Sequence, residues 1–300
     1  MTGKVVVITG ATSGIGKVAA EKLTGMGARM VIVARDRSRG AATLDGLRSI
    51  NGSAKHTIHY ADLSRLAEMR RVAAEIAAAE PRIDVLINNA GALFGSRHLT
   101  QDGLELTFAT NHLAYFVVSL GLLDRLRASA PSRVINTSSD AHEKATLDFD
   151  DLQSEKAYHG SLGNTLRYGG PGFKVYALSK LCNILFTREL ARRLEGIGVT
   201  VNCFHPGFVD TRFGDESGGL ISWGLRAAKH LAISPEKGAE TLVYLASSPE
   251  VADATGRYFF QCRPTSPTSQ AQDDRAARRL WQESERLSSL VGVLPASPAS

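Results

Sequence analysis

Cysteine is scarce in this chain, and its spacing suits neither a disulfide framework nor a zinc site. The 300 residues include three cysteines, Cys182, Cys203 and Cys262, which lie far apart. Their number is odd, and no two of them stand in the close pair that metal-binding motifs use. This usage is typical of a reducing compartment, so we expect a cytoplasmic protein without a metal centre.

Long apolar runs are also missing. No stretch of about 18 apolar residues occurs, and the most apolar helical stretch, Tyr115 to Leu123, is interrupted by Ser119 and Gly121. The strand expected from Lys4 to Thr9 starts after only three residues, which leaves no room for the charged and apolar segments of a signal peptide. We therefore expect neither a membrane span nor a secretory signal.

Charge of one sign does not dominate the surface. The chain has 35 Lys and Arg residues, 30 Asp and Glu residues and a net charge of +5, with both signs interspersed. Aromatic residues make up 7% and do not stud a basic stripe, which is the pattern that would favour a nucleic-acid partner. We predict an ordinary solvated surface and no nucleic-acid binding.

Short β-branched runs alternate with longer amphipathic stretches such as Arg65 to Glu80. Seven runs of this kind begin at Val5, Met30, His56, Val85, Arg133, Val199 and Arg257. Most are continuously apolar, which is typical of strands that are buried on both faces. The pattern predicts an α/β fold with a doubly wound parallel sheet, the Rossmann fold, formed by a single domain of residues 1–263. Its ligands are expected beyond the carboxyl ends of the strands.

The segment from Asp140 to Lys174 breaks this alternation. Its length of some 35 residues far exceeds the median connection of about 4–6 residues, and connections of this length are usually functional or mobile. We expect the insertion at residues 140–174 to lie near the substrate site. Residues in it such as Tyr158 and Phe173 are candidates for lining or covering the substrate pocket.

Residues 264–300 form a C-terminal tail in this interpretation. The tail opens with a linker rich in Pro, Ser, Thr and Gln, and a helix is expected from Asp273 to about Leu290. An apolar stripe runs along that helix through Leu280, Trp281, Leu287 and Leu290. We expect the stripe to pack on the surface of the domain or on a partner.

A glycine-rich turn from Thr9 to Gly16 follows the first predicted strand. Glycines in such a turn permit a sharp reversal and a close approach by a pyrophosphate, and the free N–H groups of the following helix favour the anion. The alternative is that the glycines only relieve a tight turn. We predict a phosphate site that comprises Gly10, Thr12, Ser13, Gly14, Ile15 and Gly16.

Arg35 follows the second predicted strand, at the position that discriminates between the two nicotinamide dinucleotides. A guanidinium pairs with the 2′-phosphate of NADP, whereas a carboxylate would bind the ribose hydroxyls of NAD, so NADP(H) is favoured. Asp36 next to it keeps NAD(H) possible, and the arginines here can also simply open a solvated helix. Asp62, after the third strand, is expected either to meet the adenine or to cap the next helix.

Tyr176 and Lys180 are one helical turn apart in VYALSK. A carbonyl reduced by hydride transfer needs a proton donor, and a nearby ammonium is expected to lower the pKa of a tyrosine from its ordinary value near 10. Because most YxxxK pairs are surface pairs without a function, the pair is informative only together with other motifs.

Other motifs of this kind occur in the chain. They stand in the order in which the short-chain dehydrogenase/reductase family has them, and the chain resembles that family over residues 4 to about 262. The motifs are TGxxxGxG at Thr9–Gly16, Asn88-Asn89-Ala90-Gly91, Asn111, Ser138-Ser139, Tyr176 with Lys180, and Pro206-Gly207. The phrases DLQSEKAY at Asp151 and SKLCNILFTRELARRL at Ser179 are similar to the retinol dehydrogenase-like branch.

The resemblance implies catalytic roles for Asn111, Ser139, Tyr176 and Lys180. Tyr176 would be the general acid in reduction, Lys180 would hold the nicotinamide ribose, and Ser139 would bind the substrate carbonyl. Asn111 would join a proton path, or would only close a kink in its helix. Further cofactor contacts implied by the resemblance are Asp62, Leu63, Asn89, Ala90, Gly91, Pro206, Gly207 and Thr211.

These observations predict an NADP(H)-dependent oxidoreductase, active as a monomer or a homo-oligomer. It would move hydride between the nicotinamide and a small apolar ketone or aldehyde, or the matching alcohol. The alternatives are an NAD-dependent alcohol dehydrogenase and a dinucleotide-sensing protein of the same fold without turnover. Ser13 stands where NADP enzymes of the family often have a basic residue, so the NADP preference depends largely on Arg35. His142 and His205, near the predicted pocket, are expected to be structural.

Overall fold

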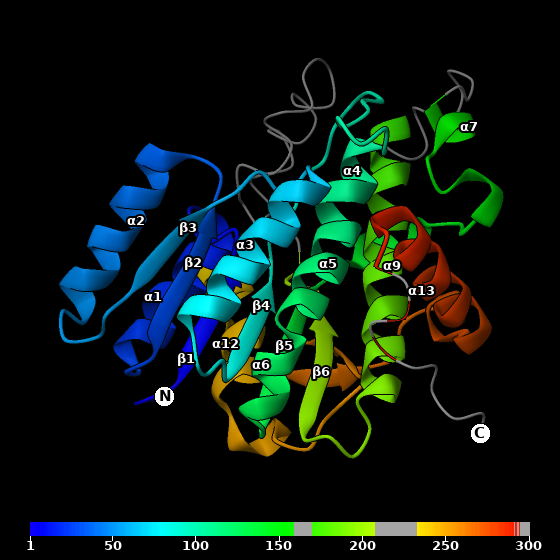
Figure 1. Ribbon diagram of the computed structural model, residues 1–300. Helices are drawn as coiled ribbons and strands as arrows, with labels where there is room; N and C mark the ends of the chain where they lie inside the picture. The colour runs from blue at the N-terminus through cyan, green and yellow to red at the C-terminus, as the bar shows by residue number, and fades with distance from the viewer. Residues whose placement is uncertain (159–169, 208–232, 291, 293, 295–300) are drawn as a thin grey trace.

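A central sheet of eight strands carries helices on both of its faces (Figure 1). The computed structural model describes residues 1–158, 170–207, 233–290, 292 and 294. The strands are β1 (Val5–Thr9), β2 (Arg29–Ala34), β3 (Thr57–Tyr60), β4 (Val85–Asn88), β5 (Ser132–Thr137), β6 (Val199–Phe204), β7 (Tyr258–Phe260) and β8 (Arg263–Thr265). Strands β1 to β7 are parallel and correspond to the seven predicted runs, which confirms the predicted doubly wound sheet.

The strand order is β3-β2-β1-β4-β5-β6-β7-β8. The chain therefore builds outward from β1 in one direction through β2 and β3, and in the other through β4 to β7. Where the order reverses, between β1 and β4, the connections diverge to opposite faces and leave a crevice at the carboxyl ends of the strands. The predicted ligand-binding edge lies at this crevice.

The described helices flank the sheet or connect its strands. Those on or beside the faces are α1 (Gly14–Gly25), α2 (Arg37–Ile50), α3 (Leu66–Ala79), α5 (Ala114–Gly121), α6 (Leu123–Ala128), α9 (Pro171–Arg193), α12 (Glu240–Ser247) and α13 (Asp274–Ser288). The shorter elements are α4 (Leu106–Phe108), η1 (Ala109–Leu113), η2 (Asp140–Lys144), η3 (Phe149–Asp151), α7 (Glu155–Tyr158), α11 (Pro235–Gly238), η5 (Pro249–Val251) and η6 (Gln270–Gln272).

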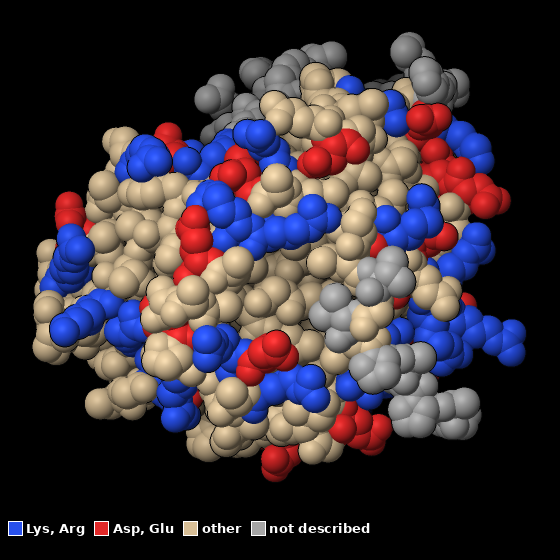
Figure 2. Space-filling model, in the orientation of Figure 1, with Lys and Arg blue, Asp and Glu red and all other residues tan. Residues whose placement is uncertain are grey.

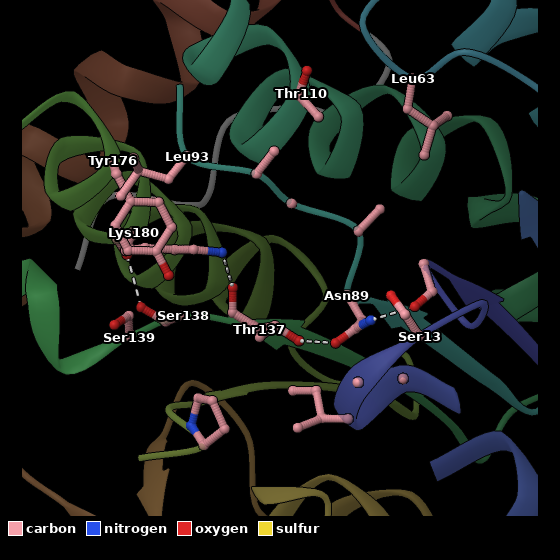
Figure 3. A pocket seen from close by; sticks show the side chains of 18 of the residues that line it. Ser13, Leu63, Asn89, Leu93, Thr110, Thr137, Ser138, Ser139, Tyr176 and Lys180 are labelled. Carbon is pink, nitrogen blue, oxygen red and sulfur yellow. Dashed lines mark hydrogen bonds between the residues drawn. The ribbon is translucent and has the colours of Figure 1, made fainter. Parts of the chain in front are cut away.

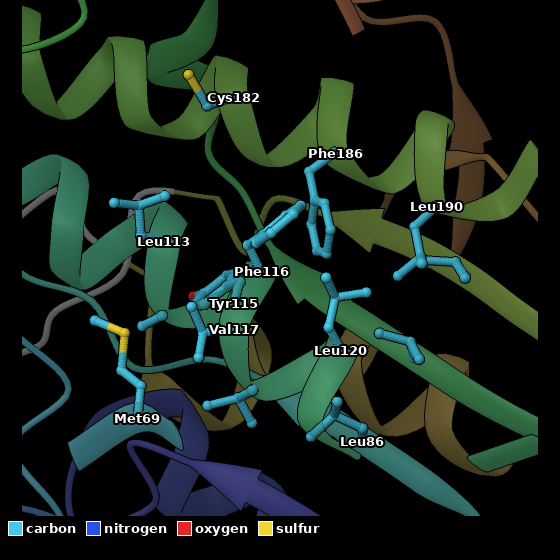
Figure 4. Close-up of a cluster of buried hydrophobic side chains, with 14 of the residues drawn as sticks. Met69, Leu86, Leu113, Tyr115, Phe116, Val117, Leu120, Cys182, Phe186 and Leu190 are labelled. Carbon is cyan, nitrogen blue, oxygen red and sulfur yellow. The ribbon is translucent and has the colours of Figure 1, made fainter. Parts of the chain in front are cut away.

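Successive strand residues point to opposite faces of the sheet, and the helices that cover each face bury them. In β1, Val6 and Ile8 pack with the residues of α1 and α12, whereas Val7 belongs to the core on the other face. Figure 4 shows that second core, where Phe116 of α5 and Phe186 of α9 meet above the sheet. Continuous apolar strands thus reflect two cores, one on each side.

The C-terminal helix α13 completes the core on the α9 face. The predicted helix is present, and the side chains of Leu280 and Trp281 are 1% and 2% exposed. The Trp281 ring lies edge-on to Phe116, with centroids 4.9 Å apart, and stacks on Phe186 at 6.0 Å. The apolar stripe was expected to pack on the domain or on a partner. In the described structure it packs on the domain, against α5 and α9.

The expected linker after residue 263 begins instead as a strand. Residues Arg263–Thr265 form β8, which pairs antiparallel with β7 at the edge of the sheet. The two strands are joined by Gln261 and Cys262, whose φ angles are 48° and 60°. Two-residue hairpin turns require positive φ and usually contain Gly or Asn, so the sequence carried no signal for this turn.

The expected 140–174 insertion is partly helical. It contains η2, η3 and α7, and α9 already begins at Pro171, three residues before the expected end. Pro171 occupies the first turn of the helix, where its missing N–H costs no hydrogen bond. Residues 159–169 of the insertion lie outside the described residues.

The face of the molecule in Figure 2 carries Lys and Arg side chains among Asp and Glu side chains. The arrangement on this face is the mixed-sign surface that the sequence led us to expect. Among the helices of the described ranges, none has both the length and the apolar character that crossing a bilayer requires.

Candidate active site

A cleft with a volume of about 890 Å³ opens at the carboxyl ends of the strands. Figure 3 shows Tyr176 and Lys180 extending from α9 toward Ser139 and its neighbours at the end of β5. The predicted residues that line the cleft are Gly10, Thr12, Ser13, Gly14, Ile15, Gly16, Arg35, Asp62, Leu63, Asn89, Ala90, Gly91, Ser139, Tyr176, Lys180, Pro206 and Gly207. Asn111 lies behind the lining, and Thr211 lies outside the described residues.

The glycine turn leaves no room for side chains where it passes β4. Gly10 has a φ of +71°, and a Cβ there would lie 2.7 Å from the Cα of Ala90. At Gly16 a Cβ would meet the Gly10 carbonyl oxygen at 2.3 Å and the amide nitrogen of Asn89 at 2.4 Å. Both glycines are therefore required by close backbone packing, which brings the start of α1 against the end of β4.

Thr9 and Asn89 hold that packing through hydrogen bonds. Thr9 Oγ1 accepts from the backbone N–H groups of Asn89 and Ala90, both at 3.0 Å. The Asn89 amide donates to the carbonyl oxygen of Gly10 at 3.0 Å and accepts from Thr137 Oγ1 at 3.3 Å (Figure 3). The ends of β1, β4 and β5 are thus joined into one rigid floor under the cleft.

The N-terminus of α1 is suited to an anion. Ser13, the residue before the helix, makes no capping bond with its side chain, and the first turn contains no acidic residue. The cleft is lined by Gly14, Ile15 and Gly16 of that first turn. Helix N-termini have N–H groups without intrahelical acceptors and a partial positive charge, so this end fits the pyrophosphate of a dinucleotide.

Arginines line the cleft at the end of β2. Arg35 and Arg39 both belong to the lining, and Arg39 also lies 3.8 Å from the Asp36 carboxylate. Asp36 caps α2, because its Oδ1 accepts from the backbone N–H of Arg39 at 2.8 Å. Arg37 turns elsewhere, with its guanidinium 4.7 Å from the centre of the Tyr60 ring. The end of the cleft at β2 therefore offers two guanidinium groups to an anion.

Asp62 follows β3 and has a local partner. Its Oδ1 accepts from the backbone N–H of Ser64 at 3.0 Å and from the Ser64 hydroxyl at 2.8 Å. The first N–H of α3, that of Leu66, is accepted by Asp102 instead, at 2.9 Å. Asp62 was expected either to cap α3 or to meet the adenine, and it does not cap α3. It fixes the turn before that helix and lines the cleft.

Lys180 reaches the floor of the cleft from α9. Its Nζ donates to the carbonyl oxygen of Thr137 at 3.1 Å and lies 5.4 Å from the centre of the Tyr176 ring. The residue is 2% exposed. Burial of the ammonium lowers the pKa of Lys180 from its ordinary value of 10.5 to about 7.

Tyr176 is also buried, at 8% exposure. Burial raises the pKa of its phenol well above the ordinary value of 10, hydrogen bonding with Ser139 lowers it in part, and the charge of Asp140 raises it further. The sequence led us to expect a pKa lowered by Lys180. The direction is opposite in this structure because the loss of solvation outweighs the hydrogen bond with Ser139, the contact that lowers the pKa of Tyr176.

The two serines after β5 have different partners. Ser138 Oγ is buried and donates to the carbonyl oxygen of Lys180 at 2.8 Å, which ties β5 to α9. Ser139 Oγ donates to Asp140 Oδ1 at 3.0 Å and accepts from the backbone N–H of Ala141 at 3.1 Å. Ser139 is the more exposed of the two, as the alternation along an extended strand predicts.

Asn111 lies in η1, a π-helical turn between α4 and α5, and is fully buried. Its amide group bonds both the N–H and the carbonyl oxygen of Ala92 at 2.9 Å, and donates to Ser179 Oγ at 3.0 Å. The Asn183 amide donates to the backbone carbonyl oxygens of Asn111 and Thr137, at 3.0 and 3.2 Å. Asn111 thus fixes the loop after β4, and Asn183 links it to the acceptor of Lys180.

His112, next to Asn111, connects this turn to the C-terminal helix. Its Nε2 lies 2.9 Å from Ser284 Oγ of α13, and both residues are fully buried. The Ser284 hydroxyl donates to the carbonyl oxygen of Leu280, so it accepts the N–H of His112. Burial lowers the pKa of His112 to about 4, which keeps the ring neutral.

The two histidines near the cleft make structural contacts. His142 Nδ1 lies 2.7 Å from the carbonyl oxygen of Ser139, and the backbone N–H of Thr268 donates to its Nε2 at 3.4 Å. His205 stacks on Phe260, with ring centroids 4.0 Å apart. The described part of the chain holds no group of three metal-ligating side chains.

Three residues of this arrangement escaped the sequence interpretation. Thr137 supplies a backbone carbonyl, which no side-chain motif reports. Asn183 follows Lys180 by three residues, a spacing that places both on one helix face and so carried a usable signal. Asp140 follows the Ser138-Ser139 pair directly, and only the coordinates place its carboxylate against the Ser139 hydroxyl.

Comparison with known proteins assigns this site to a family. The family model described as short chain dehydrogenase matches residues 4–149, and the one described as enoyl-(acyl carrier protein) reductase matches residues 161–260. Retinol dehydrogenase 14 of Homo sapiens is 40% identical over 316 residues, covering 98% of this chain and 88% of that protein. The chain belongs to the short-chain dehydrogenase/reductase family.

Within the short-chain dehydrogenase/reductase family the chain lies in the retinol dehydrogenase-like branch, as its sequence predicted. Retinol dehydrogenase 13 of Homo sapiens is 40% identical over 296 residues, covering 95% of this chain and 84% of that protein. The chain is therefore an oxidoreductase of the class that acts on CH–OH and C=O groups.

Solved structures of short-chain dehydrogenases/reductases and similar proteins share the fold. A putative uncharacterized protein from Mycobacterium Paratuberculosis is 29% identical with a TM-score of 0.74, covering 99% of this chain and 96% of that one. A short chain dehydrogenase from Burkholderia cenocepacia, solved in complex with NADP, is 25% identical with a TM-score of 0.66, covering 86% and 96%.

Proposed function

We propose that this chain is an NADP(H)-dependent oxidoreductase that reduces an apolar ketone or aldehyde. The observation that carries the proposal is the position of Tyr176, Lys180 and Ser139 at one end of a cleft whose other end contains Arg35. The cleft runs past the ends of four neighbouring strands, β2, β1, β4 and β5, and residues at or directly after each of these ends line it. A dinucleotide along it would have its adenine half at Arg35 and its nicotinamide half at Tyr176.

In this proposal Tyr176 donates the proton and Ser139 positions the carbonyl oxygen. Bound NADPH would supply the hydride for the carbonyl carbon. The raised pKa of Tyr176 keeps the phenol protonated at neutral pH, which is the form that a general acid needs.

The preference for NADP(H) rests on the guanidinium groups at the end of β2. Arg35 and Arg39 line the cleft there, and a phosphate accepts charge-assisted hydrogen bonds from such groups. The NAD alternative would use Asp36, but that carboxylate already caps α2. The solved relative from Burkholderia cenocepacia that holds NADP lends support from outside this chain.

The substrate side of the cleft supports an apolar carbonyl compound. The residues that contribute apolar surface near Tyr176 are Leu93, Phe94, Leu106, Ala141 and Phe173. The relatives named retinol dehydrogenase lend support to an apolar alcohol or carbonyl partner. The cytoplasmic location remains a prediction from the three unpaired cysteines.

A panel of ketones and aldehydes, followed by NADPH fluorescence, tests the proposal. We expect the protein to consume NADPH with at least one apolar member of the panel, and the Tyr176→Phe variant to bind NADPH without consuming it. Binding of NADPH by the unaltered protein with no consumption across the panel would favour the dinucleotide-sensing alternative. Turnover with NADH but not with NADPH would favour the NAD-dependent alternative.

A further inference from the structure

A carboxylate stands directly beside the position proposed for the reacting carbonyl. Asp140 lines the cleft and is exposed to it. Its Oδ1 accepts the hydroxyl of Ser139 at 3.0 Å. Within the described ranges, Ser139 is the residue that donates a hydrogen bond to the Asp140 carboxylate, and no Lys or Arg there forms an ion pair with it.

This negative charge opposes the reaction when nothing binds to it. Reduction develops negative charge on the carbonyl oxygen, and a neighbouring anion repels that charge. A short apolar side chain at residue 140 would avoid the repulsion. Asp140 is exposed, and no cation of the described residues neutralises it, so its carboxylate is open to a donor on the substrate.

The Ser139 hydroxyl indicates what that partner is. A serine hydroxyl has one proton to donate, and here Asp140 receives it, while the N–H of Ala141 donates to the same oxygen. The hydroxyl can therefore donate to a substrate carbonyl only if Asp140 accepts a hydrogen bond from somewhere else. A donor carried by the substrate itself, close to the carbonyl, would make that exchange.

We propose that Asp140 is a specificity-determining residue that selects carbonyl substrates with a hydrogen-bond donor, a hydroxyl or an ammonium, on the carbon next to the carbonyl. The donor binds the Asp140 carboxylate and releases the Ser139 hydroxyl to the carbonyl oxygen. The inference rests on the proposed reduction and names its substrate class: apolar ketones with an α-hydroxyl or α-ammonium group. The apolar remainder would contact Leu93 and Phe173.

Glu143 provides a matched control for charge. It lines the same cleft and belongs to the same helical turn, η2, but within the described residues the Ser139 hydroxyl donates to Asp140 and not to Glu143. A general effect of negative charge in the cleft would appear in both Asp140→Asn and Glu143→Gln. An effect of the exchange at Ser139 would appear at Asp140 alone.

The test compares propiophenone with its α-hydroxy, α-methoxy and α-ammonium derivatives. The methoxy compound has the same oxygen as the hydroxy compound but no donor. For the unaltered protein we expect kcat/KM for the hydroxy compound to exceed that for the methoxy compound by about 10- to 100-fold, the range for a charge-assisted hydrogen bond. In Asp140→Ala this ratio is expected to fall to about 1, and in Glu143→Gln to stay within twofold of the unaltered protein.

Two further measurements distinguish the effect of the donor from the effect of the Asp140 charge. Asp140→Asn keeps an acceptor without the charge, so we expect it to lose more of the preference for the ammonium compound than for the hydroxy compound. Dissociation constants of the four compounds for the NADP-loaded protein, measured by calorimetry, give the same ratios without turnover. A hydroxy-to-methoxy ratio near 1 in the unaltered protein, or one that Asp140→Ala leaves unchanged, overturns the inference.

Failure of the proposed function gives a different result. If none of the compounds is reduced but calorimetry still gives an Asp140-dependent preference for donors, the binding inference stands and the proposed reduction is wrong. If propiophenone is reduced and the donor makes no difference in either measurement, the reduction stands and the role of Asp140 is wrong.

Discussion

The ammonium nitrogen of Lys180 lies 3.1 Å from the carbonyl oxygen of Thr137, so the pair joins α9 to the last residue of β5. Asn183 donates to the same oxygen at 3.2 Å. One backbone carbonyl thus accepts hydrogen bonds from two side chains of α9. The contact fixes the direction of the Lys180 side chain, but it places a cation where water does not reach it.

Replacement of Lys180 by methionine is expected to stabilise the cofactor-free protein at neutral pH. The pKa of Lys180 is 10.5 ordinarily and about 7 when folded, so at pH values between these two the unfolded chain binds a proton that the folded chain has lost. The resulting penalty is complete below about pH 7 and disappears as the pH rises toward 10.5. We expect Lys180→Met to raise the free energy of unfolding by on the order of 4–5 kcal/mol at pH 7, since each pKa unit is worth about 1.4 kcal/mol, and by much less at pH 10.

Urea unfolding of the two proteins at both pH values measures this difference. Lys17→Met, at an exposed lysine of α1, serves as the control and should change the free energy of unfolding little at either pH. Equal stability of Lys180→Met and the unaltered protein at pH 7 would contradict the lowered pKa.

Replacement of Tyr176 by phenylalanine should remove turnover and preserve cofactor binding. The change deletes the proton donor but keeps the ring that packs near Phe173. Loss of a general acid costs about 100- to 10,000-fold in rate. NADPH affinity, measured by fluorescence titration, is expected to stay within a few-fold of the unaltered protein.

Tyr244→Phe is the matched control, because the Tyr244 hydroxyl bonds Glu250 on the exposed surface of α12. Its kcat should equal that of the unaltered protein. Substantial reduction by Tyr176→Phe would mean that another group donates the proton.

Arg35→Asp should shift the cofactor preference from NADPH toward NADH. The substitution removes a guanidinium that lines the cleft and introduces repulsion against a 2′-phosphate. We expect the ratio of kcat/KM for NADPH over NADH to fall by about 10- to 100-fold, the range for a charge-assisted hydrogen bond.

Arg37→Asp changes the same charge nearby, but Arg37 stacks on Tyr60 and is absent from the cleft lining. Its cofactor ratio should remain close to that of the unaltered protein. An equal shift in both variants would indicate that long-range charge, rather than contact at Arg35, determines the preference.

Trp281→Ala should destabilise the whole domain, because α13 shares the core with α5 and α9. The variant leaves a cavity between Phe116 and Phe186, and loss of a buried tryptophan costs about 3–5 kcal/mol. Denaturant unfolding monitored by circular dichroism measures the change. Gln282→Ala, at the neighbouring exposed position, should change the free energy of unfolding by less than about 0.5 kcal/mol. A loss confined to α13 alone would show that the helix is an independent appendage.

The sequence predicted the seven parallel strands because continuous apolar runs leave few alternatives to burial on both faces. Nearly every described residue that it predicted for the site lines the cleft, since the carboxyl ends of parallel strands converge on one edge. The hairpin from β7 to β8 was not predicted, because Gln261 and Cys262 adopt positive φ without the usual Gly or Asn.

The electrostatics of the site could not be derived from spacing. The four-residue separation of Tyr176 and Lys180 correctly placed both in one cleft, but the direction of the pKa change at Tyr176 depends on how deeply each is buried. The contact of Ser139 with Asp140 depends in the same way on the path of the chain into η2. Both are properties of tertiary packing, which a linear pattern does not contain.

The hydrogen bond from His112 to Ser284 ties the turn that carries Asn111 to α13, a helix that the ribosome produces after all eight strands of the described sheet. A nascent chain that has already exposed β1 through β7 still lacks the acceptor for His112 and the indole that covers Phe116 and Phe186. Until α13 emerges, that aromatic surface is open to molecular chaperones and to other unfinished chains. Premature termination before residue 281 would therefore release a polypeptide that has every strand of the described sheet but leaves the aromatic surface of Phe116 and Phe186 uncovered.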